Sequence, residues 1–418
     1  MNCPGSTRPA PAVPAPRLAG SRSTVILAAS EGGRARILSV TVEKLRRIRA
    51  ELRETFLERE AVVDGVLAAL IAGEHVLLVG PPGTAKSMLA EEVCRRIEGG
   101  TYFSWLLTKF TTPEEIFGAI SLAGLERDEY RRVTTGKLAE AHVAFLDEVF
   151  KASSAILNAL LTILNERRFH NAGRAEPVPL RTLVGATNEV PSEDDLSALY
   201  DRFLVRFVVD YLQEDFRFLK MLTMSPTQTS TRTTLSVPEI DALAAAASRV
   251  EVPDGLLHDL AALRRDLGAR GIVASDRRWR GSLGVLRAHA LLHGRSRVGP
   301  EDAAMLEHLL WTEPSEIPEV STAIAALTRG HENEAQRIVF QARELLAWVR
   351  RDWPDEEAAT RAAVEAHKKV ADLLRRAESL KTRAGERGLD ADPVESAVRE
   401  LEEIRAAILE GGLGAERQ

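Results

Sequence analysis

The octet Gly80 to Ser87, Gly-Pro-Pro-Gly-Thr-Ala-Lys-Ser, has the residue types and spacing of a phosphate-binding loop. It follows an apolar run at 75–79 that suits a buried strand and precedes a stretch at 88–93 that suits a helix start. Backbone N–H groups in such a turn point at an anion, Lys can reach the β- and γ-phosphates, and Ser can bind Mg²⁺. We therefore expect the contacts to ATP to come from Gly80, Pro81, Pro82, Gly83, Thr84, Ala85, Lys86, Ser87 and Met88.

Ala85 stands where the usual pattern has glycine. Glycine is required only for positive φ or close approach of another group, so alanine is acceptable if φ is negative there. The sequence thus predicts negative φ at Ala85. A helix-start turn with a surface lysine is the alternative interpretation of this motif.

Two carboxylates follow the apolar run Val143-Ala144-Phe145-Leu146. A buried strand there places Asp147 at the end nearest the phosphate loop in a doubly wound sheet. Asp147 and Ser87 are the predicted Mg²⁺ ligands, and Glu148 is the predicted base that orients and deprotonates the attacking water. A metal, a lysine and a water-positioning carboxylate form a minimal set for phosphoryl transfer.

Asn188 ends a further apolar run at 183–186 and is predicted to fix the water between Glu148 and the γ-phosphate. A turn-forming Asn before Pro191 is the alternative. Arg202, in Tyr200-Asp201-Arg202-Phe203, is the candidate arginine finger that reaches a neighbouring subunit's ATP, with Arg206 in reserve. An ordinary surface ion pair is the alternative for this arginine.

A helical segment with a capped start, Ser275-Asp276-Arg277-Arg278-Trp279, carries two further arginines. An arginine there that touches the γ-phosphate would couple nucleotide state to the angle of a helical lid. We expect Arg277 to bind nucleotide in this way, with Arg278 as second choice, because the local pattern does not separate the two.

The elements that must position these residues alternate between short apolar runs and helical segments over 74–210, with a weaker strand candidate at 102–106. This pattern predicts a parallel sheet covered by helices. From Ser236 onward the sequence has no strand pattern. Ser236 and Glu239 have capping-box spacing before an Ala-rich helix. The expected domains are a disordered tail (1–38), an α/β nucleotide-binding core (39–212), an all-α lid (213–313) and a helical C-terminal extension (314–418).

Composition limits the class of protein. The 418 residues carry a net charge of -6 and have a mean hydropathy of -0.12, which favours a soluble globular protein and disfavours a general nucleic-acid binder. Cys3 and Cys94 are too few for a disulfide framework, and no apolar run is long enough for a membrane span. We expect a cytoplasmic location.

The order of these motifs resembles that of AAA+ ATPases, and more narrowly that of the MoxR family and its RavA subgroup. The resemblance covers residues from about 40 to 313, and alanine in place of glycine at position 85 is typical of this family. The resemblance implies a P-loop NTPase fold, in which a parallel sheet with helices on both faces is followed by an all-α lid. The residues that carry it are Gly80–Ser87, Phe110–Gly118, Phe145–Ala152, Ile156–Asn158, Leu164–Arg167, Ala198–Phe203 and Ser275–Trp279.

The resemblance also implies what the residues alone do not. It implies two inserted hairpins, Ile120–Gly136 and Phe169–Leu180, that face a ring's central pore and grip a client. It implies a hexameric, Mg²⁺-dependent ATPase with chaperone-like activity on a protein client and a partner that bears a von Willebrand factor A domain. RavA-type proteins can carry a β-containing domain after the lid, whereas the pattern from about 314 is helical here.

Three rival functions remain open on the sequence. A nucleotide-dependent assembly scaffold would hydrolyse ATP slowly and present its C-terminal helices to a partner. A DNA-remodelling ATPase of the same superfamily is disfavoured by the net charge. A small-molecule kinase fits least, because it needs neither an arginine from a neighbour nor a long helical tail.

Overall fold

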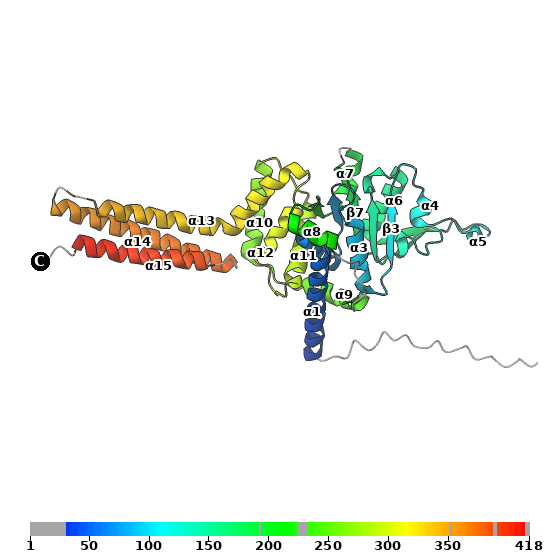
Figure 1. The fold of residues 1–418 in the computed structure, drawn as a ribbon, viewed down its shortest axis with the longest axis horizontal. Coiled ribbons are helices and arrows are strands. Elements are labelled where there is room, and N and C mark those ends of the chain that lie inside the picture. Colours follow the sequence, from blue (N-terminus) through cyan, green and yellow to red (C-terminus); the bar gives the residue numbers. More distant parts are fainter. Residues whose placement is uncertain are drawn as a thin grey trace, which may run out of the picture.

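The computed structural model describes residues 31–191, 194–223, 232–351, 353, 355–387 and 391–413. An α/β core lies at one end, a helical lid in the middle, and a long helical arm at the other end (Figure 1). Residues 1–30 of the expected tail lie outside the described residues. The first helix, α1 (Glu31–Thr55), begins within the segment that we assigned to the tail.

The core is a five-stranded parallel sheet, as the sequence predicts. Every residue of β1 and β7 is buried, which explains their continuous apolar runs. The strand β8 was not among the expected strands, since Arg206 interrupts its apolar run. In spatial order the strands are β3 (Tyr102–Leu106), β4 (Val143–Asp147), β7 (Thr182–Thr187), β1 (Val76–Val79) and β8 (Val205–Val208).

Helices pack on this sheet, with α2 against β1 and β8, and α3 against β3 and β4. Two small sheets complete the core: β2 (Ile97–Glu98) pairs with β9 (Leu235–Ser236), and β5 (Arg168–Asn171) pairs with β6 (Arg174–Pro177). The remaining core helices are α2 (Glu60–Ala72), α3 (Lys86–Arg95), α4 (Pro113–Phe117), α5 (Leu122–Leu125), α6 (Ser154–Glu166), α7 (Asp194–Tyr200) and α8 (Asp215–Thr223).

The lid and the arm are helical, which confirms the predicted fold class. Ser236 and Glu239 form the expected capping box. The lid contains α9 (Val237–Ala247), α10 (Asp254–Ala269), α11 (Asp276–Leu292) and α12 (Pro300–Ala303), and the arm contains α13 (Ile317–Val349), α14 (Glu356–Arg387) and α15 (Asp392–Leu413).

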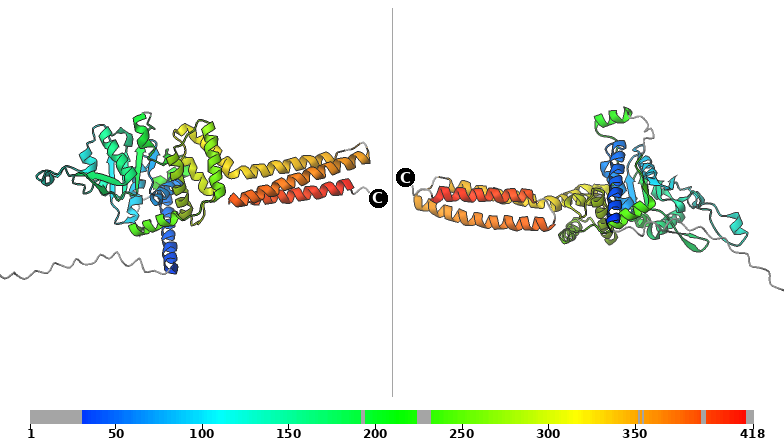
Figure 2. Two further views of the ribbon diagram at one scale, coloured as in Figure 1. Left: turned by 180° about the vertical axis from the view of Figure 1, so that it is seen from behind. Right: turned by 90° about the horizontal axis from the view of Figure 1, so that it is seen from below.

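The arm is a bundle of three helices with its own apolar core, and it projects away from the lid in every view (Figures 1 and 2). Helix α13 belongs to both parts. Its first turns bury Val320, Ala323 and Ile324 in the main core, whereas Ile338 and Ala342 belong to the core of the bundle. The lid therefore extends past the expected boundary at 313, because one continuous helix crosses it.

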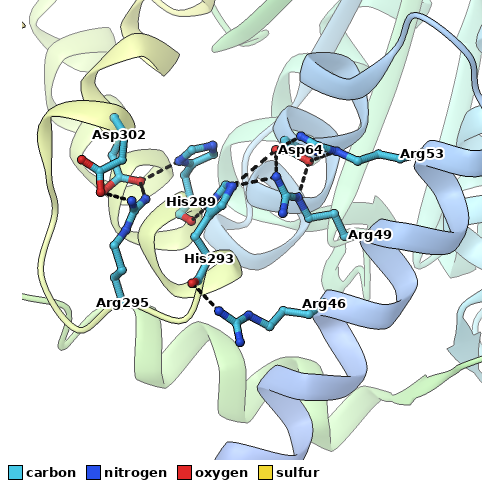
Figure 3. A network of polar contacts seen from close by, with 9 residues as sticks. Arg46, Arg49, Arg53, Asp64, His289, His293, Arg295 and Asp302 are labelled. Carbon is cyan, nitrogen blue, oxygen red and sulfur yellow. Dashed lines mark hydrogen bonds and ion pairs between the residues drawn. The ribbon is translucent and has the colours of Figure 1, made fainter.

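Helix α1 is joined to the core and to the lid by buried charge (Figure 3). Asp64 of α2 is 4% exposed and accepts hydrogen bonds from Arg49 and Arg53 of α1, at 2.7 Å from Arg49 Nε and 2.7 Å from Arg53 Nη2. His293, which follows α11, lies with Nε2 2.7 Å from Arg49 Nη2. This network connects three segments that are distant in the sequence.

The same cluster has ligand atoms at metal-like spacing, since atoms of Asp64, His289 and His293 lie within 4.8 Å of one another. Both oxygens of Asp64, however, accept from guanidinium groups, and two adjacent positive charges oppose a bound cation. We therefore interpret the cluster as an ionic joint between α1, α2 and the lid.

Histidine burial makes the stability of the protein depend on pH. His75 is buried, and burial, with Arg167 nearby, holds its pKa well below the usual value. A histidine whose folded pKa is depressed adds stability above its unfolded pKa of about 6.5, and that stability is lost as pH falls. We expect the unfolding midpoint to drop between pH 7.5 and 5.5.

The variant His75→Gln tests this assignment. It should be less stable than wild type at pH 7.5 but lose less stability on acidification, because a neutral side chain has no proton to gain. Urea unfolding of both proteins at the two pH values measures the difference. Equal losses in the two proteins would show that His75 is not the group responsible.

Candidate nucleotide-binding site

The phosphate loop joins β1 to α3 as the sequence predicts. Gly80 N–H donates to the Thr187 carbonyl at 3.0 Å, so the loop starts beside the end of β7. Gly80 has φ of 153°, and a Cβ there would lie 2.0 Å from the Val209 carbonyl oxygen, so only glycine fits. Close approach of the neighbouring chain thus explains the first glycine of the motif.

Ala85 differs from our expectation. Its φ is +63°, in the left-handed region, directly before the helix begins at Lys86. An L-residue other than glycine is strained there by about 1–2 kcal/mol. Such strain is often held at functional sites by surrounding structure. The prediction of negative φ was wrong, because the turn into α3 needs a left-handed residue whichever side chain stands there.

Lys86 lies over the loop and is 8% exposed. Its Nζ donates to the carbonyls of Gly80 and Pro81, each at 2.7 Å. Burial lowers the pKa of Lys86, although the carboxylates of Asp147 and Glu148 favour its charged form. Those carboxylates are therefore close enough to act on the lysine, as a shared phosphate site requires.

Asp147 and Ser87 fit a divalent cation. Asp147 ends β4, against which α3 packs, and its Oδ1 accepts the Glu148 N–H at 3.0 Å. Ser87 is exposed in the first turn of α3. A hydroxyl and a carboxylate oxygen are hard ligands of the kind that Mg²⁺ prefers, so these two residues would hold the ion.

Glu148 and Asn188 are brought together by the parallel order of β4 and β7. Asn188 Nδ2 donates to Glu148 Oε1 at 2.7 Å, and Lys151 Nζ lies 3.1 Å from the same oxygen. Glu148 also has a left-handed backbone, with φ of +52°. The amide and the lysine fix the carboxylate orientation, which suits a group that must position a water. We had not assigned Lys151 a role at this site.

An apolar cavity of about 410 Å³ adjoins the loop at Gly83, Thr84, Ala85 and Met88. Its volume is in the range of small-ligand pockets. Sequence reasoning missed most of its wall, because three separate segments supply it and none carries a motif. Those lining residues are Thr55, Phe56, Leu57, Arg59, Tyr211, Leu212, Phe218 and Met221.

Comparison with known proteins agrees with this geometry. The pattern of the MoxR domain in the MoxR-vWA-beta-propeller ternary systems matches residues 43–246, and that of an AAA lid domain matches 255–324. The chaperone MoxR1 of Mycobacterium tuberculosis is 30% identical over 65% of this chain and 75% of its own length. The chain belongs to the MoxR family of AAA+ ATPases.

Two further comparisons extend this result. An uncharacterised protein of Methanocaldococcus jannaschii is 39% identical to this MoxR-family chain over 70% of it and 76% of the relative. A solved structure from Cytophaga hutchinsonii, assigned as an ATPase, superposes with a TM-score of 0.57 over 71% of this chain and 96% of that one. At 17% identity the second comparison supports the fold alone.

Arg202 of this MoxR-family chain lies at the edge of the sheet opposite its own phosphate loop. β8 begins at Val205, which pairs with Val76 at the start of β1. Val76 is four residues from Gly80 along β1, so these two residues are roughly 13 Å apart at about 3.3 Å per residue. Arg202 therefore lies near the end of the strands opposite its own loop.

Arg277 lies at the same edge as Arg202, in the first turn of α11. Ser275 caps α11 and donates to Asp201 Oδ1 at 3.0 Å, which holds the first turn of α11 beside Arg202. The charge of Arg277 acts on Glu74, the residue two before β1. The lid packs against the start of β1 rather than over the loop, and sequence alone does not fix that docking.

Arg206 and Arg278, the two reserve arginines, are structural. Arg206 is 1% exposed and donates to the carbonyls of Phe203, Tyr200 and Trp311 at 2.8–3.0 Å. Arg278 is 2% exposed and donates to the Trp311 carbonyl at 2.7 Å. Burial lowers the pKa of Arg278 to about 9. Because both guanidinium groups are buried, Arg202 and Arg277 are the more accessible members of the two pairs.

Proposed function

We propose that this chain is a RavA-like, Mg²⁺-dependent ATPase that forms a ring, six-membered by resemblance, and remodels a protein client. The observation that carries the proposal is the separation of the chemical groups into two halves. The loop, Asp147, Glu148 and Asn188 lie at one edge of the sheet, and Arg202 and Arg277 lie at the other.

The arginines of the second half are only partly buried. Arg202 Nε and Arg277 Nη1 are buried, and neither has a hydrogen-bond partner among the residues that the structure describes. Both side chains are otherwise partly exposed, so a neighbour's phosphate would be able to reach their remaining guanidinium nitrogens. We therefore place Arg277, together with Arg202, at the nucleotide of the next subunit.

The apolar cavity beside Gly83 and Met88 is the proposed site for the adenine base. Phe56, Phe218 and Met221 offer apolar and aromatic surface for a flat ring. The site thus combines a phosphate cradle, a base pocket and a metal pair in one subunit.

The partner and location remain proposals too. The matching MoxR domain pattern is described for systems that contain a vWA component, which supports a partner with a von Willebrand factor A domain. Within the described residues, no helix has the length and apolarity needed to cross a membrane. A cytoplasmic location is proposed on the resemblance.

A mixing experiment tests the shared site. Lys86→Ala and Arg202→Ala should each be inactive, but a mixture should regain part of the ATPase activity, because some interfaces combine an intact loop with an intact Arg202. Specific activity of wild type should also rise with protein concentration. Steady-state phosphate release measures both effects.

The matched control is a mixture of Lys86→Ala with Glu148→Gln. Both lesions lie in the loop half, so no interface in that mixture is intact and no activity should return. Equal activity in the two mixtures, or wild-type activity independent of concentration, would remove Arg202 from the mechanism and favour a monomeric site.

A further inference from the structure

The first inserted hairpin projects from the core and ends in α5, the outermost helix on that side of the molecule (Figure 1). Its strands are held by Ser121 N–H to the Arg131 carbonyl at 2.7 Å and by Val133 N–H to the Ala119 carbonyl at 2.8 Å. Arg132 bridges Ile120 across the hairpin. In that antiparallel pattern the N–H and C=O of Arg132 point away from the partner strand.

Those outward groups are bound by one side chain of the second hairpin. Asn171 of β5 is 3% exposed. Its Oδ1 accepts the Arg132 N–H at 2.7 Å, and its Nδ2 donates to the Arg132 carbonyl at 3.2 Å. The amide thus takes the place of a peptide group and extends the pairing from one hairpin to the other. Arg131 and Glu176, 3.6 Å apart, add an ion pair beside it.

The second hairpin is connected to the catalytic residues on both sides. β5 follows α6, which follows the Glu148 segment, and β6 leads into β7, which ends beside Asn188. A shift at Glu148 and Asn188 can therefore reach β5–β6 through short covalent paths. The first hairpin leads into β4 and so to Glu148, but it has no such path to Asn188, and Asn171 provides its contact with the segment that does.

We propose that Asn171 is a positioning residue that makes the two hairpins one moving unit, so that nucleotide-driven shifts reach the tip at α5. The tip exposes Leu122 (79%) and Tyr130 (61%), which are suited to contact an unfolded, apolar segment of a client. The nucleotide dependence in this inference rests on the proposed function, whereas the contact between Asn171 and Arg132 does not.

Hydrogen exchange in the full chain tests whether the contact between Asn171 and Arg132 holds the two hairpins together. Asn171→Ala should speed exchange of amides in 119–133 about tenfold, because it removes two hydrogen bonds from that hairpin. Asn171→Asp keeps an acceptor for Arg132 N–H but sets a carboxylate oxygen against the Arg132 carbonyl and Glu176, so it should speed exchange as well. Arg168→Ala, an exposed change on the same strand, is the matched control. Exchange in Asn171→Ala that equals the control would overturn the inference.

Transmission needs a second measurement, with and without a non-hydrolysable ATP analogue and Mg²⁺. In wild type the analogue should alter exchange in both 119–133 and 168–177. In Asn171→Ala the change should persist in 168–177 and be clearly reduced in 119–133, while basal ATPase stays unchanged. An undiminished change at both hairpins in the variant would refute transmission through Asn171. A chain that binds no nucleotide would refute the proposed function, and the comparison without nucleotide would still decide the joint.

Discussion

Glu148→Gln should reduce ATP turnover by about 10²–10⁴-fold while ATP binding persists. The amide matches the carboxylate in size and can still contact Asn188 and Lys151, but it cannot accept a proton from the attacking water. Binding depends on the loop backbone and Lys86, which the change leaves in place. Single-turnover phosphate release and binding of a fluorescent ATP analogue measure the two effects separately.

The control for this variant is Glu166→Gln, an exposed carboxylate at the end of α6. It should keep wild-type turnover, since it lies outside the site. A Glu148→Gln protein with normal turnover would show that another group is the base. Loss of nucleotide binding along with turnover would instead mean that the variant disturbs the strained backbone at this position.

Asp64→Ala should lower the free energy of unfolding by about 3 kcal/mol, because it leaves two guanidinium groups in the joint without their counter-charge. The carboxylate is 4% exposed and accepts from both Arg49 and Arg53. The side chains of these arginines are 21% and 33% exposed, so water relieves part of the cost. Urea unfolding followed by circular dichroism measures the loss.

Asp276→Ala offers a matched comparison. Asp276 also forms an ion pair, with Arg264 at 3.1 Å, but its side chain is 86% exposed. Exposed pairs contribute about 0–1 kcal/mol, so this change should have little effect. If the two aspartate variants lost equal stability, burial of the joint would not be its source of strength.

Local sequence was sufficient for the phosphate loop, the strand that ends in Asp147 and Glu148, and the strand that ends at Asn188. Each of these is a short contiguous pattern in which side-chain chemistry and strand–turn–helix order occur together. The fold class follows from the same alternation and is confirmed. The roles of these residues in hydrolysis stay predictions until the variants above are measured.

Local sequence could not predict which arginine of each neighbouring pair is buried. Arg202 and Arg206, like Arg277 and Arg278, sit in similar strings of residues, yet one member of each pair is buried against Trp311 and the other is not. Only the packing of the lid against β8 distinguishes them. The base pocket was equally hidden, because its wall comes from segments far apart in the chain.

By itself, the sequence determined which residues can bind phosphate, hold a metal and position a water, since motif chemistry depends on neighbours along the chain. Tertiary structure decided which edge of the sheet each group occupies. The cap of α11 binds Asp201, so Arg277 lies near Arg202, and Asn171 binds Arg132 across two separate insertions. Such contacts depend on how the elements pack, and packing joins residues that no local pattern relates.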